Sequence, residues 1–426
     1  MLILARYIGN KGDLLGPILE EVGKRASPGD LVCDIFSGTL AVSLELKRQG
    51  YRVASNDINL LSAVFGRAYL TSSSVPVVDL ATLLPRSRVA EVRATATEVV
   101  EQLEGRPGFQ FLAVPVRRSE YELFVALLVH LETVHESDLP AAARRTYIFD
   151  IYSAEGRRSA FVSSRGSRGR RSFFAGHNAR RIDLILNQLR VWHIAGLLGD
   201  QLLSALLAVL LTGVEKISNT QGTYHDFPRG DPDPRARHPL SLAPPPLDGL
   251  LGPSQGHILG IERDSLDFIR EVPHHKVLYL DPPYNFRQYT AYYFLPNVLS
   301  RYVHIEDLES YFSGIRYVRG QNPADDFSST FNSPRLFIDS LATLIGRADT
   351  EWVVLSYFSG RNHWGEFKSD NSAAVGQEKV TQLFESDLFR PGSQRVVPIS
   401  RMNYQSYGGH RAKAVDEYLF VAEKVQ

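Results

Sequence analysis

The sequence predicts an α/β fold in which a mostly parallel sheet is interrupted by a long, mainly helical insertion. A strand–helix–strand unit occupies residues 1–70, strand-like runs resume in residues 256–426, and this alternation fails in residues 71–255. Strands that alternate with helices indicate a parallel sheet covered by helices on both faces. We therefore expect one sheet domain built from both ends of the chain, with residues 71–255 inserted into it.

The first part of the chain has the order of a βαβ unit. It begins with an amphipathic helix whose apolar residues recur at helical spacing, namely Leu14, Leu15, Ile18, Leu19 and Val22. Residues 31–36 are a nearly continuous apolar run, as expected of a strand buried on both faces. A Ser-Gly-Thr turn and a helix-like stretch that ends at Gly50 come next. Residues 51–57 predict a second strand that ends at Asp57.

The inserted region contains helix-like stretches at 119–136 and 194–217 and a Pro-rich surface connection. Asp200 and Gln201 interrupt the apolar run 194–211, which favours a buried helix over a membrane span. After the insertion, strands and helices alternate again. Strand-like runs lie at 257–262, 276–280, 351–357, 394–400 and 416–423, and helix-like segments lie at 334–347 and 377–386.

The composition is that of a globular chain that needs no disulfide or metal crosslinks. Of 426 residues, 47 are Lys or Arg and 47 are Asp or Glu, and the resulting net charge of zero argues at first against a polyanionic partner. The single cysteine, Cys33, excludes an intramolecular disulfide and a Cys/His zinc cluster. We expect no metal, and we expect a reducing, cytoplasmic location because the first residues lack the basic region of a signal peptide.

The strongest chemical signal is the segment LDPPYN, in which Asp281, Pro282, Pro283 and Tyr284 follow an apolar strand. Two consecutive prolines cannot continue a sheet ladder, so they force a rigid turn at the carboxyl end of the strand, where ligands bind in open α/β sheets. The turn offers a carboxylate, the Pro282 carbonyl and an aromatic ring, which together suit an exocyclic amino group on a planar base. The alternative is a turn that only caps the strand.

A second signal is the turn DIFSGT, which contains Asp34, Phe36, Ser37, Gly38 and Thr39. A small-residue turn lets a ligand approach the backbone at the start of a helix. Asn56 and Asp57 end the next strand, where a carboxylate is placed to accept from ribose hydroxyls. Leu40 follows in place of another glycine, so a pyrophosphate cradle fits poorly and a ribose without a phosphate fits better. An ordinary βα turn would explain the motif equally well.

The third signal is RYIGNKGD near the N-terminus. It contains Tyr7, Gly9 and Lys11, with two glycines that allow close backbone approach and a lysine that supplies a cation for a carboxylate. A plain N-terminal cap explains this segment nearly as well.

Taken together and in this order, the three motifs resemble the Dam-type (alpha-group) DNA adenine-N6 methyltransferases. The resemblance covers about the first 70 residues and residues 256–426. A smaller subgroup looks closer still, because RQY follows DPPYN and an LSY strand end lies at 355–357. The resemblance implies a Rossmann-like class I methyltransferase sheet, which is mostly parallel and has a C-terminal antiparallel hairpin. It also implies that residues 71–255 are a target-recognition region. Leu40 stands where that family usually has a second glycine, at the methionine end of the cofactor.

The resemblance also implies S-adenosylmethionine as cofactor and a flipped adenine in double-stranded DNA as substrate. Lys11 would hold the cofactor carboxylate and Asp57 its ribose, while Phe36 and Gly38 would line the methionine and adenosine side. Asp264 would lie beside the cofactor adenine, with Glu262 and Asp267 as neighbouring alternatives. The remaining cofactor residues would be Tyr7, Gly9, Asp34, Ser37, Thr39 and Asn56.

Whole-chain neutrality hides a basic segment. Residues 151–190 carry nine arginines against Glu155 and Asp183, a local charge of +7 that leaves −7 for the rest of the chain. Its Arg/Ser/Gly-rich part predicts a mobile arm or loop that orders on a phosphate backbone, with a solvated charge run as the alternative. The expected DNA contacts are Arg157, Arg158, Arg165, Arg168, Arg170, Arg171, Arg287 and Tyr289.

The predicted activity is therefore site-specific methylation of DNA adenine, in a restriction-modification or other defence system with possible cognate components, or as an orphan mark. Cytosine-N4 methylation, RNA adenine methylation and a non-catalytic DNA-binding subunit of the same fold are the alternatives.

Overall fold

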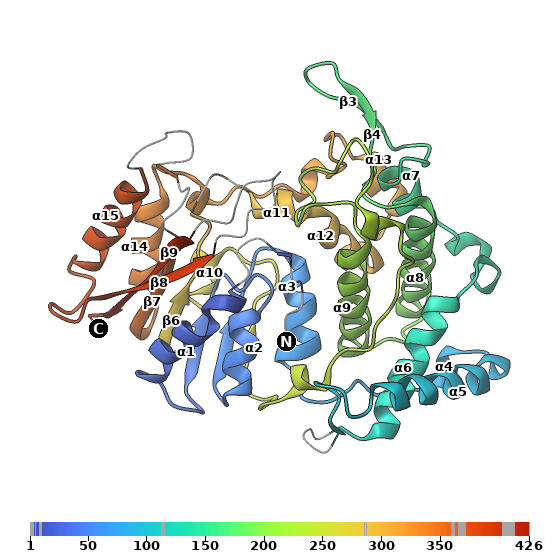
Figure 1. Ribbon diagram of the computed structural model, residues 1–426, viewed down its shortest axis with the longest axis horizontal. Coiled ribbons are helices and arrows are strands. Elements are labelled where there is room, and N and C mark those ends of the chain that lie inside the picture. The colour runs from blue at the N-terminus through green and yellow to red at the C-terminus, as the bar shows by residue number, and fades with distance from the viewer. Residues whose placement is uncertain are drawn as a thin grey trace.

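The computed structural model describes residues 4, 6–7, 11–111, 116–284, 286, 288–358, 363–364, 372–402 and 414–425. Its central element is a seven-stranded sheet of order β5-β2-β1-β6-β7-β9-β8 (Figure 1). The strands are β1 (Leu31–Asp34), β2 (Arg52–Ser55), β5 (Ile258–Leu259), β6 (His275–Leu280), β7 (Thr350–Phe358), β8 (Arg395–Met402) and β9 (Ala414–Glu423).

The first five strands of this order are parallel, and the last two form an antiparallel hairpin. β9 pairs antiparallel with both β7 and β8, with Phe358 opposite Glu417 at one end of the β7–β9 ladder. The mostly parallel sheet and its C-terminal hairpin confirm the predicted fold class. β8 is an edge strand and carries Pro398, which a central strand does not tolerate because proline has no N–H for the ladder.

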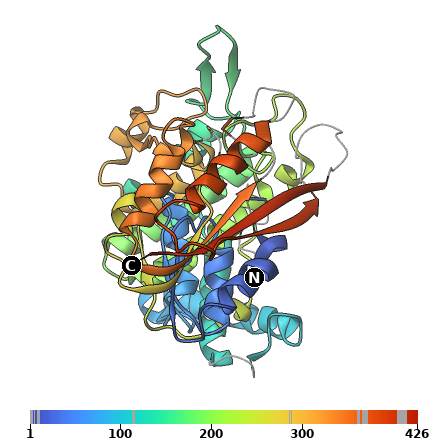
Figure 2. The same ribbon diagram turned by 90° about the vertical axis from the view of Figure 1, so that its left-hand side faces the viewer.

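Helices cover both faces of the sheet. Alternate residues of each strand point to opposite sides, so β1 and β6, for example, contribute to both hydrophobic clusters. On one face, Val32 and Val277 pack with helices α1 (Leu15–Gly23), α2 (Ala41–Arg48) and α3 (Leu60–Phe65). On the other face, Cys33 and Leu278 pack with α10 (Ser265–Phe268), α14 (Phe337–Arg347) and α15 (Ser372–Phe384). Figure 2 shows α14 and α15, in orange and red, on one side of the strands and the blue helices on the other.

The inserted region is mainly helical, and it lies beside the sheet in Figure 1. Its helices are α4 (Leu80–Leu83), α5 (Arg86–Leu103), α6 (Arg118–Thr133), α7 (Tyr147–Tyr152), α8 (Gly176–Ile194) and α9 (Asp200–Ile217). The chain re-enters the sheet at β5 and β6, and the helices that follow β6, α11 (Tyr289–Tyr292), α12 (Phe294–Arg301) and α13 (Leu308–Ser313), lie against the insertion, with α12 packed on α9. One hydrophobic cluster continues from the α1–α3 face of the sheet into α6, α8 and α9, so these helices share their core with that face.

The apolar run 194–211 does not form one helix. α8 ends at Ile194, and α9 begins at Asp200 after a turn that contains Gly196 at φ +71°. Glycine adopts this left-handed conformation without steric cost, so the chain turns here. No helix in the described part of the chain is long and apolar enough to span a membrane.

A two-stranded antiparallel hairpin, β3 (Ala160–Val162) and β4 (Arg168–Arg170), projects from the insertion at the top of Figure 1. The sequence predicted a mobile arm or loop here, and the structure has two paired strands in place of a loop. The buried ring of Phe161 lies against Gly169, where a Cβ atom would come within 2.8 Å of the ring, so the strands are held together by packing as well as by the ladder.

Candidate active site

The three sequence motifs meet at one pocket at the carboxyl ends of β1, β2 and β6. The pocket encloses about 950 Å³ of empty space, a volume that includes its opening to solvent. The residues predicted as site residues that line it are Tyr7, Lys11, Asp34, Phe36, Ser37, Gly38, Thr39, Asn56, Asp57, Asp264, Asp281, Pro282, Pro283, Tyr284 and Tyr289. Glu262 and Asp267, the alternatives to Asp264, are not among the lining residues. Gly9 and Arg287 lie outside the described residues.

The Ser-Gly-Thr turn is held by the acidic residue that follows the second strand. Asp57 accepts hydrogen bonds from the backbone N–H of Gly38 at 2.9 Å and of Asn59 at 2.9 Å. Gly38 has a φ of +50°, and a Cβ atom there would lie 3.2 Å from the ring of Tyr7. Burial raises the pKa of Asp57, while the hydrogen bonds from Asn59 and Gly38 oppose that rise. The two halves of the cofactor motif therefore hold each other in place.

Leu40 does not enter the pocket. Its side chain is fully buried in the hydrophobic cluster beside α2, and it is not among the lining residues. Its backbone has a φ of +60°, the left-handed region that favours glycine, at the residue just before α2. The leucine therefore keeps a glycine-like backbone, and its side chain packs into the core and does not narrow the pocket.

Three buried polar atoms in the pocket have no hydrogen-bond partner within the described part of the chain. They are Asp34 Oδ1, Asn56 Oδ1 and Tyr279 Oη. Buried polar groups are normally satisfied, so these atoms are suited to the amino and hydroxyl groups of a bound ligand. Tyr279 was missed by the sequence reasoning, although its place on β6, two residues before Asp281, puts it on the same side of the strand.

The pKa of the Asp34 carboxyl group lies near neutral pH. Burial raises its pKa to about 7, and the negative charges of nearby Asp281 and Asp57 add to the rise. The Ser43 hydroxyl opposes the rise, because it donates a hydrogen bond to Asp34 Oδ2 at 2.6 Å. A cation placed in the pocket would favour the ionised carboxylate. The pocket therefore suits a ligand with a positive charge.

Lys11 lies between two carboxylates of the protein. Its Nζ is 3.0 Å from Asp281 Oδ1 and also contacts Glu417 Oε1, and the lysine side chain is only 6% exposed. Burial by itself would lower the pKa of Lys11, but the charges of Asp281 and Glu417 outweigh burial and raise it. The expected partner of Lys11 was the carboxylate of a cofactor, and the structure places two protein carboxylates there. Glu417 was not anticipated.

Aromatic rings form two walls of the pocket. Tyr284 packs near Tyr357 and Phe358, with ring centroids 6.0 and 5.8 Å away. Tyr7 stacks on Tyr293 with centroids 4.1 Å apart, and Tyr289 lies 6.3 Å from Tyr7. A planar base that enters between these walls has stacking partners close to the Asp281 carboxylate.

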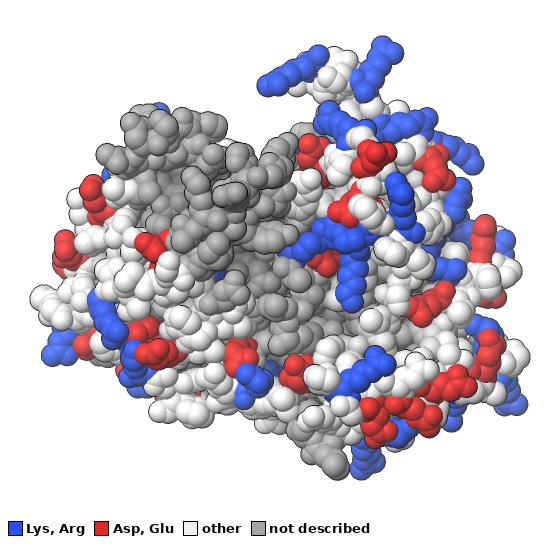
Figure 3. Space-filling view, in the orientation of Figure 1, with Lys and Arg blue, Asp and Glu red and all other residues white. Residues whose placement is uncertain are grey.

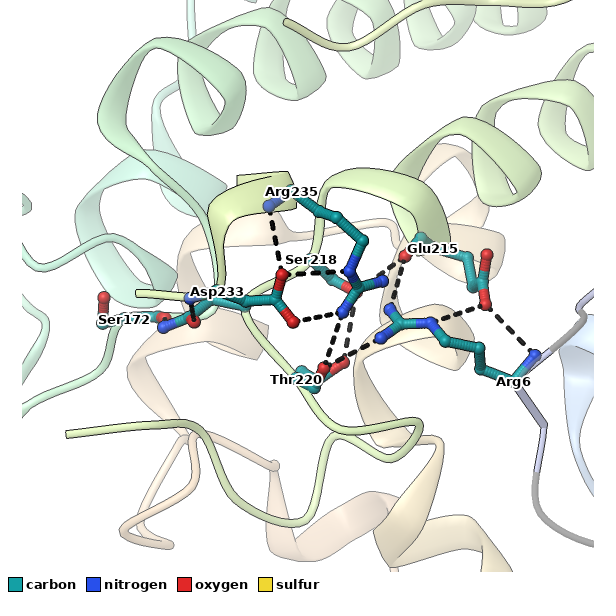
Figure 4. A network of polar contacts seen from close by, with 8 residues as sticks. Arg6, Ser172, Glu215, Ser218, Thr220, Asp233 and Arg235 are labelled. Atoms are coloured by element: carbon teal, nitrogen blue, oxygen red, sulfur yellow. Dashed lines mark hydrogen bonds and ion pairs between the residues drawn. The ribbon is translucent and has the colours of Figure 1, made fainter. Parts of the chain in front are cut away.

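Arg6 connects this site to the insertion (Figure 4). Its guanidinium donates to Glu215 at the end of α9 and, through Nη1, to the carbonyl of Thr220 at 3.1 Å. Arg235 donates to the same Thr220 carbonyl at 3.2 Å. The segment that carries Tyr7 and Lys11 is thus anchored on the region that follows α9, which no local sequence pattern indicates.

The predicted DNA-contact arginines fall into two groups. Arg157, Arg158, Arg165 and Arg168 are exposed, and Figure 3 shows basic side chains gathered around the projecting hairpin. Arg158 forms an ion pair with Glu309 at 3.3 Å. Arg170 is exposed but donates to the carbonyls of Ala154 and Gly156.

Arg171 differs from the expectation for a DNA contact. It is 6% exposed, and its guanidinium donates to the backbone carbonyls of Arg158, Tyr317 and Val318. A buried guanidinium that satisfies three carbonyls is committed to the fold. We therefore assign Arg171 to the base of the hairpin and leave it out of the DNA-contact surface.

No group of three or more His, Cys, Asp or Glu side chains arranged to hold a metal ion occurs within the described ranges.

Comparison with known proteins connects this site to a family. Residues 7–106 match the family model described as D12 class N6 adenine-specific DNA methyltransferase. Over 426 aligned residues, the chain is 26% identical to the Type II methyltransferase M.NlaIII of Neisseria lactamica, covering 98% of this chain and 99% of that protein.

Two longer relatives are matched along part of their length. The chain is 24% identical to the Type II methyltransferase M.FokI of Planomicrobium okeanokoites over 420 residues, which is 98% of this chain and 52% of that protein. It is 24% identical to the modification methylase LlaI of Lactococcus lactis subsp. lactis over 397 residues, which is 88% of this chain and 54% of that protein. The chain thus spans about half the length of these two relatives and nearly all of the first.

Proposed function

We propose that the chain is an adenine-specific DNA methyltransferase of the D12 class, which transfers the methyl group of S-adenosylmethionine to N6 of an adenine flipped out of duplex DNA. We assign it to the Dam-type (alpha) group on the order of its motifs. The observation that carries the proposal is the single pocket in which the Ser-Gly-Thr turn, Asp57 and the Asp-Pro-Pro-Tyr turn meet. These are the parts needed to hold a nucleoside cofactor beside a base.

The acceptors of the Asp-Pro-Pro-Tyr turn explain how the amino group is activated. The adenine N6 is a poor nucleophile because its lone pair is delocalised into the ring. Hydrogen bonds from N6 to the Asp281 carboxylate and the Pro282 carbonyl favour a pyramidal nitrogen and stabilise the positive charge that develops on it. Such preorganised contacts are worth about 3 kcal/mol each. Among the described residues, no backbone N–H donates to the Pro282 carbonyl, which leaves it available for the substrate.

The cofactor supplies a methyl group activated by its sulfonium charge. Asp57 has two oxygens at the turn, and although each accepts from the backbone, a carboxylate has further lone pairs for the ribose hydroxyls. We assign the unsatisfied oxygens of Asp34 and Tyr279, which line the pocket, to the amino-acid end of the cofactor, and Asp264 to its adenine end. Because Lys11 already faces two carboxylates, its role is shared between the cofactor and Asp281.

The walls of the pocket provide for base flipping. Extrusion of a base from duplex DNA costs a few kcal/mol, and stacking on an aromatic side chain returns about 1 to 3 kcal/mol. Tyr284 and Tyr289 are two of the aromatic residues that line the pocket together with Asp281. The exposed arginines of the hairpin, Arg165 and Arg168, are proposed to contact the phosphate backbone of the DNA. Arg287 is proposed as a further contact on sequence grounds.

Product analysis tests this proposal. The purified chain is incubated with duplex DNA, single-stranded RNA and cofactor labelled in the methyl group, and the nucleosides are separated. We expect label on N6-methyladenine from duplex DNA. Label found on N4-methylcytosine, or on RNA alone, would establish one of the alternative substrates. Absence of label despite measured cofactor and DNA binding would indicate a non-catalytic subunit.

A role in restriction-modification is proposed from the names of the relatives, two of which are called Type II methyltransferases and one a modification methylase. Sequencing the modified bases in DNA from cells that express the chain would give its recognition site. A single short motif, modified at every copy, is the expected result. Scattered modification without a motif would argue against a protective role.

A further inference from the structure

Glu417 is a fully buried carboxylate at the edge of the sheet that carries the catalytic turn. It lies near the start of β9 and is 0% exposed. β9 runs antiparallel to β7, so its first residues reach the edge where β6 ends at Asp281. A buried carboxylate requires partners, and those of Glu417 include Lys11 Nζ and the hydroxyl of Ser356, which donates to Glu417 Oε1 at 2.6 Å.

We infer that Glu417 is a positioning residue for methyl transfer, because it shares the ammonium group of Lys11 with Asp281. This inference rests on the proposed function. One cation lies between two carboxylates, so Asp281 keeps part of its negative charge available to the adenine amino group. Glu417 also fixes the direction from which Lys11 approaches, and the Lys11 Nζ lies 6.0 Å from the ring centroid of Tyr284.

We expect that removal of the Glu417 charge weakens Asp281 as an acceptor. Among the described residues, Asp281 would then be the only carboxylate paired with Lys11, and a carboxylate fully paired with an ammonium group is a weaker acceptor for N6. The same change would favour ionised Asp281 at lower pH. Among the described residues, the other titratable groups coupled to Lys11, Glu417 or Asp281 include Tyr279, Asp34 and Tyr7, and all three remain in place in the variant.

The decisive variant is Glu417→Gln, which keeps the shape and the capacity to accept from Ser356. We expect kcat to fall about tenfold or more, KM for the cofactor to stay within about twofold, and the acid limb of the kcat–pH profile to move to lower pH. Loss of folded protein alone would lower the apparent kcat and leave the profile where it is. The matched control is Glu423→Gln on the same strand, whose partner Arg390 is at the surface. It should behave as the parent chain.

Ser356→Ala gives an independent test with the opposite sign. Without the Ser356 hydroxyl, Glu417 interacts more strongly with Lys11 and draws it from Asp281, so the acid limb should move to higher pH. This variant also serves if Glu417→Gln does not fold, as judged by thermal unfolding. Opposite shifts in the two variants support the inference.

An unchanged kcat and pH profile in folded Glu417→Gln would overturn the inference while leaving the proposed function intact, and so would shifts of the same sign in the two variants. If the parent chain itself forms no N6-methyladenine, the proposed function fails, whatever the variants do. The two failures are therefore distinguishable in one set of assays.

Discussion

The catalytic pocket and the basic hairpin use charge in different ways. In the pocket, Lys11, Asp34 and Asp57 are held by buried partners at fixed distances, and each partner comes from another element of the fold. On the hairpin, Arg165 and Arg168 are exposed, whereas Arg171 is buried at the base. Buried charges act at short range on an aimed group, while exposed charges act on a polyanion through a field that salt screens. The difference predicts that mutations in the two regions fail in different assays.

The largest expected effect is in the pocket. Asp281→Ala should lower kcat by about 1,000-fold or more, because it removes the acceptor for the amino group. Cofactor affinity, measured by calorimetry, should change by no more than a few-fold. Near-normal turnover of the folded variant would show that Asp281 does not activate the base.

The raised pKa of Asp34 predicts that the free energy of unfolding depends on pH. This pKa is raised from 3.8 to about 7 by burial, so between these values the folded chain keeps a proton that the unfolded chain has released. The stability that Asp34 contributes is therefore complete below about pH 4 and is lost as the pH rises towards 7.

Asp34→Asn should remove this loss. Relative to the parent chain, its free energy of unfolding in urea should improve by about 3 kcal/mol between pH 5 and pH 8. Parallel pH curves for the two proteins would mean that the carboxyl group is solvated in the pocket.

Arg171→Gln tests the division within the hairpin. The change leaves three backbone carbonyls without their guanidinium donor, and hydrogen bonds to charged groups contribute about 1.5 to 3 kcal/mol. We expect a fall of about 2 kcal/mol in the free energy of unfolding. A variant of unchanged stability but much weaker DNA binding would return Arg171 to the DNA-contact surface.

The smallest effect is expected for the exposed arginines. Arg165→Gln combined with Arg168→Gln should weaken DNA binding about tenfold at low salt and reduce the salt slope by about 0.9 for each phosphate that the variant no longer neutralises. Stability and cofactor binding should not change. The matched control is Arg86→Gln with Arg93→Gln on α5, which removes the same charge from another exposed surface. Equal loss of affinity in both pairs would mean that the hairpin has no special role.

Much of the site was predictable because its signals are local. Asp281 directly follows the apolar run that becomes β6, and Asp57 closely follows the run that becomes β2. Since parallel strands bring their carboxyl ends to one edge, the sequence alone is enough to place residues more than 200 positions apart in one pocket. The turn itself, with its small residues, also follows from local chemistry.

Glu417, Tyr279 and Arg6 were not predictable in the same way. The contact between Lys11 and Glu417 joins residues 406 positions apart, and it depends on β9 running antiparallel to β7. Arg171 has the same local composition around it as Arg168, and only packing decides which of the two is buried. The position of Leu40 in the cofactor motif can be read from the sequence, but the direction of its side chain cannot. Its packing in the core was therefore not predictable.

By itself, the sequence predicted the α/β class, the edge of the sheet at which the pocket lies, and the Asp-Pro-Pro-Tyr turn that lines it. These follow from hydrophobic periodicity and from the stiffness of proline, which act within a few residues. The tertiary structure alone decided how charges are paired: Lys11 with Asp281 and Glu417, Arg6 with the end of α9, and Arg171 with the base of the hairpin. The reason is physical, because the partner of a buried charge is set by which strands and helices lie side by side, and no local pattern encodes that.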